Sequence, residues 1–304
     1  MIRSWYGSVI PALALLSALA STAAAQDVAA GKVLPAEQLQ LKTKDGVQIM
    51  ATYLPSTKGK DAVAVILLHM FKGNRRELEG LGMLLQQKGH AVIIPDLRGH
   101  GESTSVDGQA RPLDAATMPA SQFPLMVNDL EAVKKYLVEQ NNLAKLNIEK
   151  LCVVGAEMSG PLAAIWTVMD WAWPVLPTLK QGQDVKALVL LSPTVTYKTL
   201  NAAQAFNNPK SPIRDKIALL LICGAEDVDS VREARRLNDQ LSRIRPKPLK
   251  IEEATIFMDD TLKTKLVGTK LLEEPSLGTA ALIEQFIDLR LVQQSYPWRD
   301  RKAP

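Results

Sequence analysis

Histidine and cysteine are both scarce in this sequence. The chain of 304 residues has three histidines, His69, His90 and His100, so the residues after position 100 contain no imidazole. Because histidine is the side chain that most readily exchanges a proton near neutral pH, a general base in the rest of the chain would have to be another residue type. The two cysteines, Cys152 and Cys223, each lie in an apolar run that leads to a glycine, which favours two buried free thiols over a disulfide.

The sequence also lacks blocks of like charge, internal repeats and a nucleotide-binding glycine motif. The net charge is +4, and basic residues are interspersed with acidic ones, which argues against a nucleic-acid partner. No Gly-x-Gly-x-x-Gly follows an apolar run, so no cofactor is expected. With 47% hydrophobic and 22% charged residues, and no change of composition along the chain, the sequence is typical of one globular domain.

The first 25 residues have the pattern of a secretory signal peptide. Arg3 precedes an apolar stretch at residues 9–20, and three alanines at residues 23–25 offer a cleavage site before Gln26. A retained membrane anchor is the alternative, but the stretch is shorter than the roughly 20 apolar residues that a spanning helix needs. We therefore expect a secreted or periplasmic protein that is free of the membrane after cleavage.

The remaining chain divides into a linker, one domain and a tail. We predict an N-terminal linker at residues 26–38, a single domain at residues 39–292, and a polar, frayed tail at residues 293–304. The segment at residues 194–215 is expected to be a short polar loop without a large mobile cap.

The order of apolar segments predicts a mostly parallel, doubly wound sheet. Alternating segments around Asp45-Gly46 indicate an antiparallel hairpin from Leu39 to Tyr53. Continuous apolar runs then alternate with stretches of helical spacing, which is typical of strands covered on both faces. The runs are residues 62–68, 91–95, 151–154, 187–191 and 217–223, and the helical stretches are residues 75–88, 124–140, 160–171, 230–244 and 275–292. Ligands of such sheets bind beyond the carboxyl ends of the strands.

Two segments of the chain carry a family resemblance. The first is Leu-Leu-His-Met-Phe at residues 67–71 with Gly-Asn-Arg at residues 73–75, and the second is Pro-Asp-Leu-Arg-Gly-His-Gly-Glu-Ser at residues 95–103. Together they resemble the α/β-hydrolase superfamily, especially its lid-poor esterase and serine-peptidase-like branches, over about residues 39–291. The resemblance implies the α/β-hydrolase fold with about eight strands. His69 and His100, within these segments, are expected to be structural.

The turn that carries the nucleophile in this family has a different residue here. The resemblance implies a serine on a sharp strand-to-helix turn, Gly-x-Ser-x-Gly. The corresponding turn, residues 155–160, reads Gly-Ala-Glu-Met-Ser-Gly, so Glu157 occupies the nucleophile position. Ser159 falls in the first turn of the helix, where we expect it to cap backbone N–H groups. The backbone N–H groups of Met158 and Phe71 are candidates for an oxyanion hole that binds substrate.

The other two members of the expected triad are an acid and, after it, a histidine. Asp227, four residues after Cys223, fits the acid position, although it equally fits the N-cap of the helix near Ser230. Val267 stands before Gly268, where the resemblance implies a histidine. Because valine transfers no proton, both the nucleophile and the base of the usual mechanism are absent.

These substitutions leave two functions open. The first is an exported, catalytically impaired member of the family, a pseudo-hydrolase, that binds a small ligand or a protein through the old cleft. The second is an unconventional hydrolase of ester, amide or related bonds that uses Glu157 with Asp227. The agreement between the two substitutions favours the first function.

One further expectation concerns the carboxylates of Glu157 and Asp227. With no imidazole between them they are expected to approach each other, with a bound cation, a raised pKa, or a lysine such as Lys265 or Lys270 to offset their repulsion. Asp229 is an additional candidate ligand for such a cation. No ligand spacing typical of a metal site is present, so no metal is predicted.

Overall fold

The computed structural model describes residues 33–174, 176 and 180–301. The expected signal peptide and most of the expected linker lie outside the described residues. None of the helices in the described ranges is long and apolar enough to cross a membrane.

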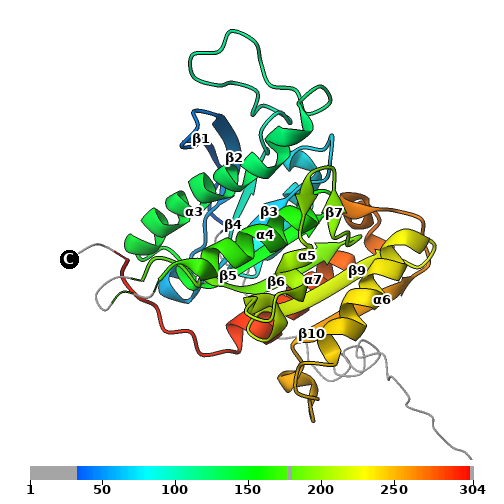
Figure 1. Ribbon diagram of the computed structural model, residues 1–304. Coiled ribbons are helices and arrows are strands. Elements are labelled where there is room, and N and C mark those ends of the chain that lie inside the picture. Colours follow the sequence, from blue (N-terminus) through cyan, green and yellow to red (C-terminus); the bar gives the residue numbers. More distant parts are fainter. Residues whose placement is uncertain (1–32, 175, 177–179, 302–304) are drawn as a thin grey trace, which may run out of the picture.

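One eight-stranded sheet forms the centre of the molecule (Figure 1), in the order β1-β2-β4-β3-β5-β6-β9-β10. Its strands are β1 (Glu37–Lys42), β2 (Gln48–Leu54), β3 (Val63–Leu68), β4 (Ala91–Pro95), β5 (Asn147–Ala156), β6 (Val185–Leu191), β9 (Ala218–Gly224) and β10 (Ile256–Leu262). The pairings of β2 with β1 and with β4 are antiparallel, and the other pairings in this sheet are parallel. The predicted doubly wound sheet with an antiparallel N-terminal hairpin is confirmed.

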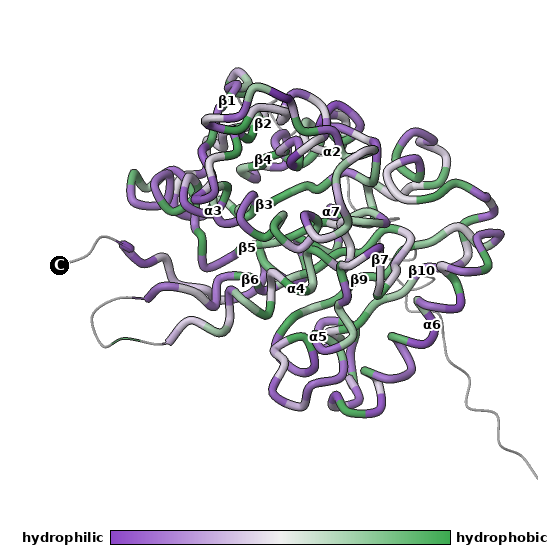
Figure 2. Tube along the Cα trace, turned by 45° about the horizontal axis from the view of Figure 1, so that its top comes forward, coloured by the Kyte–Doolittle hydropathy of each residue, from purple (hydrophilic) through white to green (hydrophobic). Residues whose placement is uncertain are grey.

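Helices cover both faces of the sheet. The longer ones are α2 (Glu79–Gln87), α3 (Val127–Asn142), α4 (Ser159–Ala172), α6 (Val228–Ser242) and α7 (Thr279–Ile287). Helices α3, α4 and α6 share one hydrophobic cluster with the sheet, whereas α2 and α7 share the cluster on the other face. In Figure 2 the central strands are coloured as hydrophobic, and many of the outer loops are coloured as hydrophilic. This pattern is expected because helices bury both faces of the sheet.

Short helical segments connect these elements. The 3-10 helices are η2 (Gly59–Asp61), η3 (Arg75–Leu78), η4 (Ala120–Met126), η5 (Pro212–Arg214), η6 (Ile251–Glu253), η7 (Gly268–Leu272) and η8 (Pro275–Leu277), and η9 (Asp288–Val292) is a π-helix. Cys152 and Cys223 are free and buried, and they belong to opposite hydrophobic clusters, so the sheet separates their thiols.

The prediction of a polar loop at residues 194–215 was wrong. This segment contains a second hairpin, β7 (Thr196–Tyr197) with β8 (Leu200–Asn201), followed by α5 (Ala203–Asn207). Leu200 and Phe206 are buried in the hydrophobic cluster of α3 and α4, and they anchor the segment to the domain. These apolar residues are too widely spaced in the sequence to show a helical or strand period. Strand β10 was also missed, because its Asp259 and Asp260 interrupt the apolar run.

The expectation of a frayed tail was also wrong for the described residues. The backbone carbonyls of Tyr296 and Arg299 accept hydrogen bonds from the side-chain amides of Asn147 and Asn141. Arg301 is buried and forms ion pairs with Asp184 and Glu149. The described part of the tail is therefore bonded to the body of the domain through four side chains, namely Asn141, Asn147, Glu149 and Asp184.

Candidate active-site cleft

The turn between β5 and α4 keeps the sharp backbone that the sequence predicted. Glu157 has a φ of +49°, in the left-handed region that residues with side chains rarely adopt. Its N–H donates to the carbonyl of Leu191 on β6 at 2.9 Å. A Cβ atom on Gly155 would lie 2.6 Å from the carbonyl oxygen of Ser159, so only glycine allows the helix to approach this closely. The side chain of Glu157 is thus presented at the carboxyl edge of the sheet.

The carboxylate of Glu157 folds back onto two backbone N–H groups. Its Oε2 accepts one hydrogen bond from Phe71, at 3.2 Å, and one from Met158, at 3.0 Å. Met158 lies at the N-terminal end of α4, where the helix dipole favours a negative charge. The two N–H groups that the sequence singled out as candidate oxyanion donors therefore converge on one oxygen atom, and that oxygen belongs to the protein.

The hydroxyl of Ser159 is bonded to backbone groups of the surrounding strands. Its hydroxyl accepts a hydrogen bond from the N–H of Ala156 at 2.7 Å and lies 3.0 Å from the carbonyls of Leu68 and Ala156. The side chain is fully buried. Ser159 thus joins β3 to the turn after β5, and its oxygen is engaged by backbone groups.

Asp227 lies after the end of β9 and begins α6. Its Oδ1 accepts a hydrogen bond from the N–H of Ser230 at 3.3 Å, so the N-cap role is present. Its Oδ2 is buried and has no hydrogen-bond partner among the described residues. A buried carboxylate oxygen without a donor costs free energy, and a triad histidine would be such a donor.

Val267 lies between the end of β9 and the turn that carries Glu157. A Cβ on Gly224 would be 3.2 Å from the carbonyl oxygen of Leu266, and a Cβ on Gly268 would be 3.5 Å from the Cβ of Glu157. Gly268 also donates its N–H to the hydroxyl of Ser192 at 2.9 Å. The loop that carries Val267 thus passes from the end of β9 to the turn of Glu157.

The carboxylates of Glu157 and Asp227 have separate hydrogen-bond partners. Within the described ranges, neither Glu157 nor Asp227 shares a hydrogen bond or ion pair with the other, with Lys265 or with Lys270. The reason is local, because the turn offers Glu157 two N–H donors and the helix N-terminus offers one to Asp227. In the same part of the chain no group of three or more His, Cys, Asp or Glu side chains is placed to hold a metal ion.

His69 and His100 are both buried, with ring centroids 4.9 Å apart. The Nε2 of His69 accepts from the N–H of Leu97 at 3.0 Å, so its Nδ1 donates to the carbonyl of Met70 at 2.8 Å. Burial, together with the neighbouring His100, lowers the pKa of His69 to about 4. Burial also lowers the pKa of His100, whose Nδ1 lies 3.1 Å from the carbonyl of Arg98. Both rings are neutral near pH 7, and both nitrogens of His69 are already engaged.

An aromatic wall that the sequence analysis missed borders Glu157. Tyr197, on β7, packs against Phe71 and Phe123 with ring centroids 5.5 and 6.2 Å away. Burial and the nearby negative charge of Glu157 raise the pKa of Tyr197 to about 12. Residues 195–197 are Val-Thr-Tyr, and all three residue types favour strands. This composition is the sequence signal that could have indicated β7.

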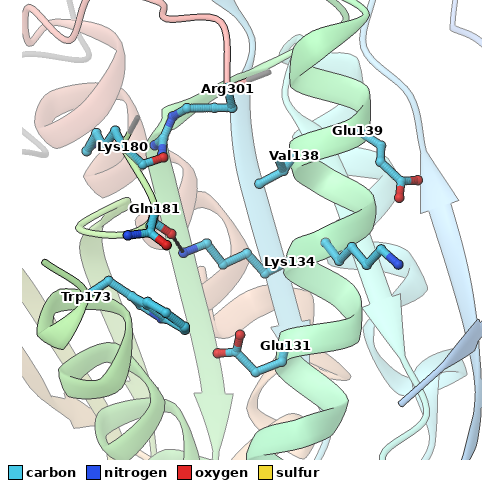
Figure 3. Close-up of a pocket in the computed structure, with 9 residues that line it drawn as sticks. Glu131, Lys134, Val138, Glu139, Trp173, Lys180, Gln181 and Arg301 are labelled. Carbon is cyan, nitrogen blue, oxygen red and sulfur yellow. Dashed lines mark hydrogen bonds between the residues drawn. The ribbon is translucent and has the colours of Figure 1, made fainter. Parts of the chain in front are cut away.

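A separate hollow of about 430 Å³ lies beside α3 and the residues that precede β6 (Figure 3). The close-up shows Lys134 reaching across it to the carbonyl of Gln181, with Arg301 and Lys180 on the same side. These cations already have carboxylate partners in Asp170, Asp184 and Glu149. The ion pairs of Arg301 beside this hollow fix the C-terminal segment to the domain. The hollow lies where β6 begins, at the opposite edge of the sheet from the turn of Glu157.

The comparisons with known proteins agree with the fold. A family model described as alpha/beta hydrolase fold matches residues 63–218, just over half of the chain. The chain belongs to the α/β-hydrolase family. A comparison with curated protein sequences finds no match.

Solved structures of other family members share the fold. An esterase from Pyrococcus furiosus is similar over 84% of this chain and 92% of its own, with a TM-score of 0.58 and 18% identity. A dienelactone hydrolase from Anabaena variabilis is similar over 84% and 99%, with a TM-score of 0.56 and 16% identity. A carboxylesterase from a metagenomic library is similar over 84% and 90%, with a TM-score of 0.54 and 15% identity. At these identities the likeness shows the fold alone.

Proposed function

We propose that this chain is a pseudo-hydrolase of the α/β-hydrolase family, exported from the cytoplasm, that binds a ligand through its old active-site cleft. The observation that carries the proposal is the hydrogen bonding of Glu157. Its own carboxylate oxygen accepts from Phe71 and Met158, the two N–H groups placed to stabilise an oxyanion. A substrate carbonyl would have to displace a charged group that never leaves the chain.

The loss of the base supports the same function. Val267 stands in the loop where the family places a histidine, and Asp227 keeps an Oδ2 without a donor. The three histidines of the chain precede Glu157 in sequence. Removing triad members leaves roughly 10³ to 10⁴ of rate enhancement over water, and that remainder depends on an oxyanion hole that is free to bind substrate.

The alternative is a hydrolase that uses Glu157 as a nucleophile, and one observation favours it. Both hydrogen bonds to the carboxylate go to Oε2, so Oε1 retains its lone pairs for attack. An ester on Glu157 would then require a base to activate water for its release. The printed hydrogen-bond partners of the Glu157 carboxylate in the described chain are two backbone N–H groups, and no imidazole is bonded to it, which makes binding the preferred function.

Export rests on the N-terminal pattern alone. A cleaved signal peptide is supported by three features, namely Arg3, the apolar stretch at residues 9–20 and the alanines at residues 23–25. We therefore place the proposed ligand, a small molecule or a protein, in the periplasm or outside the cell.

The test is hydrolysis of a panel of short-chain aryl esters by four purified proteins. They are the natural chain, Glu157→Gln, Glu157→Ser, and the double variant Glu157→Ser with Val267→His. The proposal predicts no hydrolysis above background by the first three, and hydrolysis together with labelling by a serine-directed covalent probe for the double variant. Hydrolysis by the natural chain that disappears in Glu157→Gln would establish the alternative instead.

A further inference from the structure

Three aromatic rings beside Glu157 surround a cation of the protein itself. The centroids of Phe71, Phe123 and Tyr197 lie 5.5 to 6.2 Å from one another. The Nζ atom of Lys198 lies 4.1 Å from the centroid of Phe123, 4.3 Å from that of Phe71 and 6.0 Å from that of Tyr197. All three distances are within the range in which a cation is attracted to the face of a ring.

Lys198 reaches this place from the turn of the β7–β8 hairpin. Its φ is +47°, an unfavourable backbone conformation for lysine. The next residue, Thr199, donates its hydroxyl to the carbonyl of Ala120 on η4, the segment that also carries Phe123. Among the residues that the structure describes, no carboxylate lies within ion-pair distance of Lys198. The aromatic rings are therefore its specific partners.

The surroundings of the rings favour positive charge. The carboxylate of Glu157 accepts a hydrogen bond from the backbone N–H of Phe71, and its negative charge contributes to the raised pKa of Tyr197, so it lies close to both residues. The ring of His100 meets the edge of Phe71 with centroids 5.8 Å apart, and its Nε2 is buried without a partner in the described chain. Because burial lowers the pKa of His100, this neighbour adds no competing cation.

We propose that Phe71, Phe123 and Tyr197 form a binding site for a methylated ammonium group of a small molecule, such as that of choline, and that Lys198 occupies this site in the free protein. The proposal rests on the proposed function, because it names the ligand class of the same cleft. A quaternary ammonium ion suits aromatic rings better than a lysine does, since its charge is spread over methyl groups and is weakly hydrated. Lys198 is exposed, so its side chain can leave without unfolding the hairpin.

The experiment is isothermal titration calorimetry with choline chloride and with 3,3-dimethyl-1-butanol, an uncharged compound of the same shape, at constant ionic strength. The proteins are the natural chain, Lys198→Gln, Lys72→Gln and the double variant Lys198→Gln with Tyr197→Leu. Lys72 is the matched control, because its Nζ lies 5.7 Å from Phe71 but contacts no other ring of the group. A general gain from removing positive charge would appear in both lysine variants.

The expected result is selective tightening in one variant. Lys198→Gln should bind choline about tenfold more tightly than the natural chain and about tenfold more tightly than it binds the neutral compound, in keeping with a desolvated cation–π contact. Lys72→Gln should match the natural chain, and Tyr197→Leu in the Lys198→Gln background should lose the preference for choline.

Other outcomes separate this proposal from the proposed function. If Lys198→Gln binds choline no better than the neutral compound, or if both lysine variants gain equally, the aromatic site is refuted while a non-catalytic cleft stands. If the natural chain hydrolyses a choline ester but not its uncharged counterpart, the aromatic site is supported and the absence of catalysis is contradicted.

Discussion

The loop after β4 and the turn after β5 lie at the same edge of the sheet, but they differ in how deeply their side chains are buried and paired. In the loop, buried Asp96 accepts hydrogen bonds from the N–H groups of Arg75 and Glu102 and pairs with the guanidinium of Arg75. In the turn, Glu157 and the neighbouring Val267 are only partly buried.

This difference explains which parts of the family pattern persist. Removing one partner of a buried ion pair leaves an unpaired charge in the interior and destabilises the fold strongly. Exchanging a partly buried catalytic side chain leaves the fold intact as long as the backbone of the turn can form. The loop residues are therefore fixed by folding, whereas the side chains of Glu157 and Val267 can be exchanged without loss of the fold.

The largest effect is expected in the loop after β4. Asp96→Ala leaves Arg75 without its buried partner and should lower the free energy of unfolding by about 3 to 5 kcal/mol. Denaturant-induced unfolding measures this change. Glu102→Gln is the matched control, since Glu102 pairs with the same arginine but is exposed, and it should leave stability almost unchanged. Equal losses in both variants would show that burial does not separate them.

Acid should destabilise the protein through its buried histidines. Burial lowers the pKa of His69 and of His90 from 6.5 to about 4. The folded protein thus keeps both rings neutral while the unfolded chain takes up protons below pH 6.5. Their contribution is present above that pH and is lost between about pH 6.5 and 4, by up to about 3 kcal/mol for each ring.

Unfolding curves at several pH values test this dependence. The variant His90→Leu removes one of the two groups, so its free energy of unfolding should fall less steeply with acid, by about one proton, between pH 6.5 and 4. An unchanged slope would mean that His90 titrates equally in the folded and unfolded chains.

Two substitutions at Glu157 separate its side-chain bonds from the strain of its backbone. Glu157→Ala removes two hydrogen bonds to a charged acceptor and should cost about 2 kcal/mol. Glu157→Gly removes the same bonds but relieves the positive φ, and should be more stable than the alanine variant by about 1 kcal/mol. A glycine variant less stable than the alanine variant would contradict the geometry of the turn.

The smallest effect is expected at Val267. In Val267→His the new imidazole should donate to the unpartnered Oδ2 of Asp227, which raises the pKa of the histidine by about one unit. The added stability would then be present below pH 6.5 and lost as the pH rises through the higher folded pKa. Nuclear magnetic resonance titration of the ring measures the pKa, and Asp227→Asn in the same background should remove the rise.

Much of the fold could be predicted from the sequence because the buried strands are continuous apolar runs. Residues 91–95 form β4 with the predicted bounds, and the Asp45-Gly46 turn joins β1 to β2. The β7–β8 hairpin could not be predicted in this way, because its two-residue strands are too short to show a period. Its importance comes from the contacts of Tyr197 and Lys198 with rings far away in the sequence.

The positions of the site residues could be predicted, but their partners could not. The sequence placed Glu157, Phe71 and Met158 at one edge of the sheet by their motifs. It gave no means of deciding whether the carboxylate would bond to Asp227, a lysine or the backbone, because that depends on a side-chain rotation within the turn. In the structure the carboxylate accepts hydrogen bonds from two backbone N–H groups, which the strand and the helix hold close to it.

The most direct test of the self-filled oxyanion hole is to follow the amide resonances of Phe71 and Met158 in the natural chain and in Glu157→Ala while acetate is added. The account predicts that both resonances shift when the carboxylate is removed, return toward their natural positions as acetate binds, and do not respond to acetate in the natural chain. Resonances unaffected by the substitution, or the same response to acetate in both proteins, would show that Glu157 does not fill the hole.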